Sequence, residues 1–220
     1  MFDDSFVTIK IVIVCSDEKH PVNAHLAEWI KKHQAGHDIS LLRKRKELQG
    51  GDLLFLISCS EIVRAEDRAN FTNVLVIHAS DLPHGRGWSP HIWQVVEGRD
   101  KICASMIEAE DRIDTGDIWR QIEVVIPRDA LWDEINERLF DAECRLMDYA
   151  VDNFSTVKPV AQSSLNEPSY YAKRTPADSE LDPDKSIAEQ FDLIRVCDPD
   201  RFPAFFKLRG ATYQIKLEKV

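Results

Sequence analysis

Short apolar runs separated by polar segments make up the first half of the sequence. These runs are rich in β-branched residues, as buried strands are, and they cover residues 6–14, 38–42, 53–57 and 74–77. Between the first two runs, apolar positions recur every three or four residues, as on one face of a helix: Val22, Leu26, Trp29 and Ile30. This alternation of strands and helices predicts an α/β fold, a Rossmann-like doubly wound and mostly parallel sheet.

The next part of the sequence adds two mixed strands and the longest helix. We expect the strands at residues 102–109 and 118–126, and Asp129 as the N-cap of the helix. Apolar residues then recur at helical spacing, at Leu131, Ile135, Leu139, Ala142, Leu146 and Ala150. Such periodicity indicates a face packed on the core, so we assign this helix no chemistry.

The C-terminal part of the sequence differs in style from the rest. Residues 154–168 are poor in apolar side chains and are typical of a linker. A helix near residues 185–196 and a hairpin of strands 204–208 and 211–217 should follow. We therefore divide the chain into a catalytic domain, residues 1–154, and a small C-terminal helix-plus-hairpin subdomain, residues 155–220.

A histidine and a carboxylate are the candidate acid/base pair. His78 ends the apolar run 74–77, at the carboxyl end of a predicted strand, where open α/β sheets bind ligands. Asp114 opens a glycine-containing turn after the strand predicted at 102–109. A carboxylate on such a turn can reach a histidine at the tip of a neighbouring strand. It would then fix the tautomer of the ring and favour its charged form.

Composition and charge exclude several classes of protein. The net charge of −10 opposes broad binding of nucleic acid, which depends on Lys and Arg. No apolar run is long enough to span a membrane, and no signal peptide is evident at the N-terminus. The five scattered cysteines lack metal-type spacing and are typical of reduced thiols, so we expect a cytoplasmic protein. A dinucleotide fingerprint and a Walker loop are both absent.

Several motifs together resemble one known family. The loop from His78 to Pro83, the pair Arg86-Gly87 and the turn from Asp114 to Asp117 are similar to the signature of the 10-formyltetrahydrofolate-dependent formyltransferases. Arg174-Thr175-Pro176 and Phe202-Pro203-Ala204-Phe205 resemble the tail of the sugar N-formyltransferases in this family. The resemblance implies transfer of a formyl group from 10-formyltetrahydrofolate to an amino sugar carried on a nucleotide, without a required metal. Amino sugars of bacterial surface glycans, including the pseudaminic-acid type, fit the loop best. A homodimer is a candidate assembly.

The resemblance also implies roles for individual residues. His78 and Asp114 would be catalytic. The folate would be held, mainly through backbone groups, at Cys59, Ser60, Glu61, Ile62, Val63, Ile113 and Asp114. The substrate would be contacted by Ser80, Arg86, Gly87, Trp88, Tyr171 and Arg174.

Other placements are open for several of these side chains. Arg86 could instead pair with a surface carboxylate, and Trp88 could belong to the core. Tyr171 could pack under the hairpin. His84 and His91 have no evident partners and are expected at the surface.

One position departs from the family pattern. The family has Asn two residues before the histidine, and this sequence has Val76. That amide normally helps to hold the oxyanion, and the loss of one such donor costs roughly 10²–10³ in rate. We expect another donor, first His78, then the Ser80 hydroxyl or a backbone N–H of residues 79–81. Two alternatives stay open: a methionyl-tRNA formyltransferase, which the acidic charge and the small tail disfavour, and a non-catalytic binder that has lost turnover.

Overall fold

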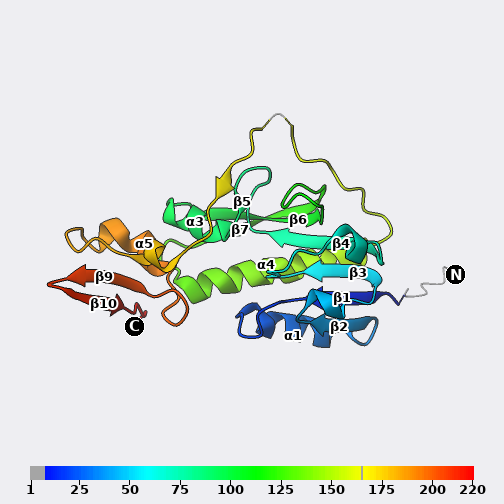
Figure 1. The fold of residues 1–220 in the computed structure, drawn as a ribbon, viewed down its shortest axis with the longest axis horizontal. Coiled ribbons are helices and arrows are strands. Elements are labelled where there is room, and N and C mark those ends of the chain that lie inside the picture. The colour runs from blue at the N-terminus through cyan, green and yellow to red at the C-terminus, as the bar shows by residue number, and fades with distance from the viewer. Residues whose placement is uncertain (1–7, 165) are drawn as a thin grey trace.

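A six-stranded sheet lies at the centre of the molecule, as the computed structural model of residues 8–164 and 166–220 shows (Figure 1). The strand order is β2-β1-β3-β4-β6-β7, with β1 Lys10–Val14, β2 Asp38–Leu42, β3 Gly51–Leu56, β4 Phe71–His78, β6 Lys101–Glu108 and β7 Ile118–Val125. β1 pairs in parallel with β2 and β3, and β3 with β4. β6 is antiparallel to both β4 and β7. The predicted Rossmann-like, mostly parallel sheet is confirmed.

The two faces of the sheet are covered differently. The larger core, on one face, includes apolar residues of three helices: α1 Val22–His33, α3 Pro90–Val96 and α4 Trp132–Asp152. The core on the other face is made by strand residues and by loop residues such as Val63. Two short helices belong to the connectors that precede β3 and β4: η1 Arg45–Glu47 and α2 Ala65–Arg68. Long helices therefore cover one face, because the connectors on the other side are polar.

The long helix α4 has the predicted apolar face, but it begins later than expected. Ile135, Leu139 and Leu146 are buried, in agreement with the periodicity. Asp129 as the N-cap is wrong: the N-cap is Leu131, whose backbone N–H donates to the Glu134 carboxylate at 2.8 Å. The Asp129 carboxylate instead accepts a hydrogen bond from the ammonium group of Lys219 at 3.2 Å.

The C-terminal part contains the predicted hairpin, β9 Ala204–Leu208 and β10 Ala211–Ile215. The predicted helix is shorter, with a 3₁₀ turn η3 Ala188–Gln190 leading into α5 Phe191–Arg195. A separate apolar cluster contains Leu181, Ile194, Cys197 and Ala204. The buried Arg195 donates hydrogen bonds to the carbonyl oxygens of Pro127 and Ala130, just before α4, which ties this part to the sheet domain. The division at residue 154 stays a prediction.

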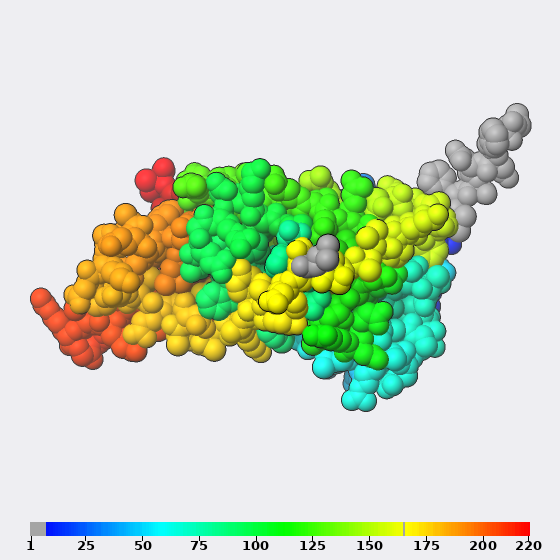
Figure 2. All heavy atoms as spheres, turned by 90° about the horizontal axis from the view of Figure 1, so that it is seen from above, coloured from blue at the N-terminus to red at the C-terminus, as the bar shows by residue number. Residues whose placement is uncertain are grey.

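The segment that follows α4 is more than a linker. It runs back over the outside of the molecule and ends in β8 Tyr170–Tyr171, which pairs in parallel with β5 Arg86–Gly87. Figure 2 shows this yellow segment lying across the green part of the chain. Among the described residues, no helix is long and apolar enough to cross a membrane.

Candidate active site

His78, the last residue of β4, is buried and has both ring nitrogens close to oxygen atoms. Its Nε2 lies 2.8 Å from the Gly85 carbonyl oxygen. Its Nδ1 lies 3.4 Å from Oδ1 of Asp114. The structure therefore brings together the two residues that the sequence predicts as an acid/base pair, at the tip of β4 and in the turn after β6.

The Asp114 turn has a backbone shape that only certain residues permit. Asp114 itself has φ 58°, in the left-handed region that Asp tolerates better than most residues. A Cβ added to Gly116 would lie 1.8 Å from the Glu108 carbonyl oxygen, so only glycine fits there. The second carboxylate oxygen of Asp114 accepts a hydrogen bond from the Gly87 N–H at 2.9 Å. The carboxylate is thus fixed in the orientation that faces His78.

The two contacts of His78 have a consequence for its chemistry. An imidazolium ring can donate to both oxygens, whereas a neutral ring can donate to one only. The Gly85 carbonyl also occupies the nitrogen that does not face Asp114. A substrate can therefore reach Nε2 only when the Gly85 carbonyl moves away from the ring.

Gln162 holds the Asp114 turn from the outside, and sequence reasoning missed it. Its amide nitrogen donates to the carbonyl oxygens of Asp114 and Gly116, both at 3.0 Å. Its amide oxygen accepts from the Arg86 guanidinium at 2.6 Å. Gln162 lies in the segment interpreted as a linker, where no local pattern marks it. Only the path of that segment across the sheet domain brings it to the turn.

Arg86 is buried and bonded to the Gln162 amide, which contradicts the alternative that it pairs with a surface carboxylate. Its guanidinium is directed at the Gln162 amide and, at 3.4 Å, at the Tyr170 hydroxyl. Its predicted contact with the substrate stays a prediction. The hydrogen bonds from Arg86 and then Arg112 lower the pKa of Tyr170. Arg86 therefore links β5 to the segment that contains Gln162.

Trp88 and its neighbours form an exposed group beside the buried pair. Trp88 is 48% exposed, and the Lys173 ammonium lies 4.7 Å from the centre of its ring. Placement of Trp88 in the core is therefore wrong. Gly87 approaches β8 so closely that an added Cβ would lie 2.3 Å from the Tyr171 carbonyl oxygen.

Tyr171 and Arg174 are bonded within the protein. The Tyr171 hydroxyl donates to Glu97 at 2.9 Å, and its ring stacks on Trp93 rather than under the hairpin. Burial, followed by the Glu97 hydrogen bond, raises the pKa of Tyr171 to about 12. Arg174 donates to the Ser179 hydroxyl at 2.9 Å. Both side chains are thus held by contacts within the protein, and their predicted roles in substrate binding stay predictions.

The predicted folate-binding residues lie on two loops. Cys59, Ser60, Glu61, Ile62 and Val63 follow β3, and Ile113 precedes Asp114. Ile62 is 67% exposed and Ile113 is 62% exposed, whereas Val63 is buried in the second core. The Ser60 N–H donates to the Ser16 hydroxyl at 3.1 Å.

Two positions bear on the missing asparagine. Val76 is half-buried and packs on the second core, paired in the sheet with Leu56 and Ile107. The Ser80 hydroxyl is buried and has no hydrogen-bond partner within the described ranges. An added Cβ on Gly85 would lie 2.9 Å from the Cβ of Ser80, so the hydroxyl lies beside the residue that caps His78. Ser80 is thus a donor without a fixed partner, whereas both His78 nitrogens already face acceptors.

Two further histidines are neutral at physiological pH. Burial is the largest cause that lowers the pKa of His91 to about 4, and the nearby charges of His20 and His78 add to it. His91 is half-buried rather than exposed as expected, whereas His84 is exposed as predicted. Burial likewise lowers the pKa of His20 to about 4, with Arg201 as the next cause.

Comparisons with known proteins agree with the motifs. Residues 17–151 match the protein family described as Formyl transferase. A methionyl-tRNA formyltransferase of Clostridium acetobutylicum is 26% identical over 188 residues, which are 84% of this chain and 58% of that relative. The chain spans about half the length of the curated relatives that it matches.

Solved structures share the fold over nearly the whole chain. A methionyl-tRNA formyltransferase from Clostridium thermocellum has a TM-score of 0.78 at 22% identity, covering 94% of this chain and 97% of that one. A sugar N-formyltransferase from Shewanella sp has a TM-score of 0.72 at 18% identity, covering 96% and 99%. At such identities the likeness concerns the fold alone.

Proposed function

The chain belongs to the formyl transferase family, and we propose that it moves a formyl group from 10-formyltetrahydrofolate to the amine of a nucleotide-linked amino sugar. The observation that carries this proposal is the buried pair His78 and Asp114 at the carboxyl end of β4. The two residues come from separate elements and are fixed by bonds to Gly85 and Gly87. A buried histidine in contact with a carboxylate is suited to proton transfer.

The proposed reaction needs an oxyanion donor and a proton acceptor. The amine attacks the formyl carbon, an oxyanion forms, and the folate nitrogen leaves as the carbonyl is restored. After the Gly85 carbonyl swings away, His78 donates to the oxyanion while Asp114 stabilises the charged ring. The Ser80 hydroxyl is the second candidate donor, because it has no fixed partner in the described part of the chain. The charged His78 ring then gives its proton to the leaving folate nitrogen, and the His78–Asp114 unit regains a proton from the ammonium group of the product, directly or through water.

Exposed apolar side chains support the folate site. Ile62 and Ile113 are large, exposed residues on the two loops that the family uses for this ligand. A flat aromatic ring placed against them would remove apolar surface from water, which favours binding. We assign the pterin ring to this position.

The group around Trp88 supports a nucleotide-linked substrate. An exposed indole gives a stacking surface, and Lys173 adds a positive charge beside it. Together they suit a ligand with both a flat or sugar ring and a phosphate. The net charge of −10 disfavours the extended phosphate backbone of a tRNA.

A formyl-transfer assay tests the proposal directly. The purified chain is incubated with 10-formyltetrahydrofolate and, separately, a panel of nucleotide-linked amino sugars and aminoacylated initiator tRNA. Mass spectrometry detects the formylated product. We expect product with at least one amino sugar and none with tRNA. Product with tRNA alone would show that the substrate is a tRNA and not an amino sugar. No product with either substrate would favour a non-catalytic binder.

A second candidate function is a non-catalytic binder, because Val76 stands where the family has the asparagine that helps to hold the oxyanion. The test is Val76→Asn in a protein shown to be folded by circular dichroism. If the wild type lacks turnover and this change restores it, the natural chain is a binder. If the wild type is active and the variant is no faster, the site has its own oxyanion donor, in agreement with the proposed enzyme.

A further inference from the structure

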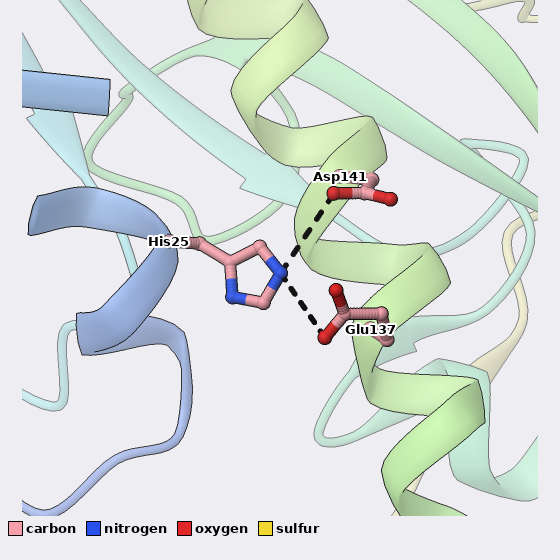
Figure 3. Close-up of side chains that lie close together, drawn as sticks. All are labelled: His25, Glu137 and Asp141. Carbon is pink, nitrogen blue, oxygen red and sulfur yellow. Dashed lines mark ion pairs between the residues drawn. The ribbon is translucent and has the colours of Figure 1, made fainter. Parts of the chain in front are cut away.

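A second cluster of ionisable side chains lies between α1 and α4 and takes no part in the proposed reaction. His25 of α1 points at two carboxylates of α4, Glu137 and Asp141 (Figure 3). The Nε2 atom of His25 lies 3.3 Å from Oε2 of Glu137 and 3.7 Å from Oδ1 of Asp141. All three potential ligand atoms lie within 4.8 Å of one another. Within the described residues, this is the group of three with such spacing.

The spacing of these atoms suits a tetrahedral metal ion. Nitrogen and oxygen ligands that lie about 2.0–2.2 Å from Zn²⁺ are roughly 3.3–3.6 Å from one another. The two measured separations from Nε2 are close to that range. The carboxylates are four residues apart on one helix, which places them on the same face one turn apart. A small rotation of these exposed side chains completes the geometry.

The charge of the cluster also favours a cation, as a neighbouring cluster shows. One or two turns further along the same two helices, Asp148 is a single carboxylate. It is bonded by Trp29 at 2.7 Å, Lys32 at 2.8 Å and His33 at 2.8 Å. Here, two carboxylates face one imidazole, and neither pairs with a Lys or Arg in the described part of the chain. Even a protonated His25 leaves one negative charge unbalanced.

The imidazole is also held in a ligand-like orientation. Its side chain is only 18% exposed, and its ring packs edge-on against Phe140, with centroids 5.4 Å apart. Its other nitrogen, Nδ1, is buried without a partner among the described residues, so Nε2 is the nitrogen presented to the carboxylates. The imidazole of His25 on α1 is thus held in place, whereas the exposed carboxylates of Glu137 and Asp141 on α4 can adjust to an ion.

We propose that His25, Glu137 and Asp141 bind one divalent transition-metal ion such as Zn²⁺, with a water molecule as the fourth ligand. The ion would join α1 to α4 and so stabilise the larger core on that face. It would take no part in formyl transfer, and the proposal is independent of the substrate.

The test is a titration of the full chain, stripped with a chelator and kept reduced without thiols. Isothermal titration calorimetry with Zn²⁺ should give one ion per chain. Glu137→Gln and Asp141→Asn, both exposed positions, should each weaken binding at least about tenfold, and the double variant should abolish it. Asp184→Asn, an exposed carboxylate elsewhere with the same change of charge, should bind as the wild type does.

Two further readouts complete the test. Zn²⁺ should raise the melting temperature of the wild type and not that of the double variant. Co²⁺ should give visible bands of a tetrahedral nitrogen and oxygen site. Three results would overturn the proposal: no saturable binding, unchanged binding by both single variants, or a sulfur-to-cobalt charge-transfer band. Without saturable binding, the three side chains would form an ion pair and no metal site. A charge-transfer band would show that cysteines bind the ion.

Discussion

The Asp114 turn and the loop after β3 both contain predicted site residues but are built in opposite ways. At the turn, side chains bond to one another: the carboxylate of Asp114 faces His78, and Gln162 holds the backbone from outside. At the loop, the side chains of Ser60, Glu61 and Ile62 are exposed, and the backbone is held by bonds such as the one from Ser60 to Ser16. Residue identity should therefore matter at the turn and backbone shape at the loop.

The largest effect is expected from the buried pair. His78→Asn and Asp114→Asn should each lower turnover by at least ~10²-fold, because each removes a partner in proton transfer. The double variant should be little worse than the poorer single, since residues that act as one unit are non-additive. Steady-state kinetics measure this, with His84→Asn, an exposed histidine of the same loop, as the control. Near-normal turnover in either single variant would show that His78 and Asp114 do not act as one catalytic unit.

A smaller but still large effect is expected at Gly116. In Gly116→Ala the new methyl group would meet the Glu108 carbonyl oxygen, so the turn must shift and carry Asp114 away from His78. We expect turnover to fall at least about tenfold, and stability to fall by about 1–3 kcal/mol, as in overpacked sites. Gly36→Ala is the control, because its nearest neighbour would lie at an ordinary 3.9 Å. Thermal unfolding and kinetics report the two effects separately, and equal behaviour of the two variants would contradict this account.

The effect of Gln162→Ala should be intermediate. The change removes both bonds to the turn and the acceptor for Arg86, but leaves the His78–Asp114 contact itself. We expect turnover to fall about tenfold, because a positioning contact costs less than a reacting group. The KM for folate should change little. Gln34→Ala, an exposed glutamine at the C-cap of α1, is the control.

A second variant tests whether Gln162 acts through its amide. Gln162→Glu keeps an oxygen for Arg86 and loses the donor to the two turn carbonyls, so it should resemble Gln162→Ala. If Gln162→Glu keeps full turnover, the bond to Arg86 is the important one, and the hydrogen bonds from Gln162 to the two turn carbonyls are not needed.

The sequence predicts the local features of this site and misses those that depend on distant segments. His78 at a strand end and Asp114 in a glycine turn follow from short-range patterns, and the structure brings the two together. The contacts of Gln162 and the burial of Arg86 depend on how residues 153–164 and 166–169 lie against the sheet domain. Nothing within that stretch encodes its docking partners, since the bonds that fix it come from β5, from the Asp114 turn and from Ile118 of β7.

The same division explains the errors in the fold. The apolar face of α4 is periodic and was predictable, but its first residue is decided by competition among nearby caps. Glu134 reaches back to the Leu131 N–H, and Lys219, far away in the sequence, is bonded to both Glu134 and Asp129. A capping residue chosen by sequence alone cannot account for such a remote partner.

The smallest effects are expected at the loop after β3, and they test the other half of the comparison. Ser60→Ala removes only an exposed hydroxyl and should change the KM for folate less than about twofold, as for most surface substitutions. Ser16→Ala removes the acceptor of the Ser60 N–H and frees the loop backbone. It should raise that KM about three- to tenfold, the cost of one ordinary hydrogen bond, with turnover at saturation unchanged. Folate binding measured by fluorescence titration checks both variants. A larger loss in Ser60→Ala than in Ser16→Ala would show that side chains, not backbone groups, hold the folate.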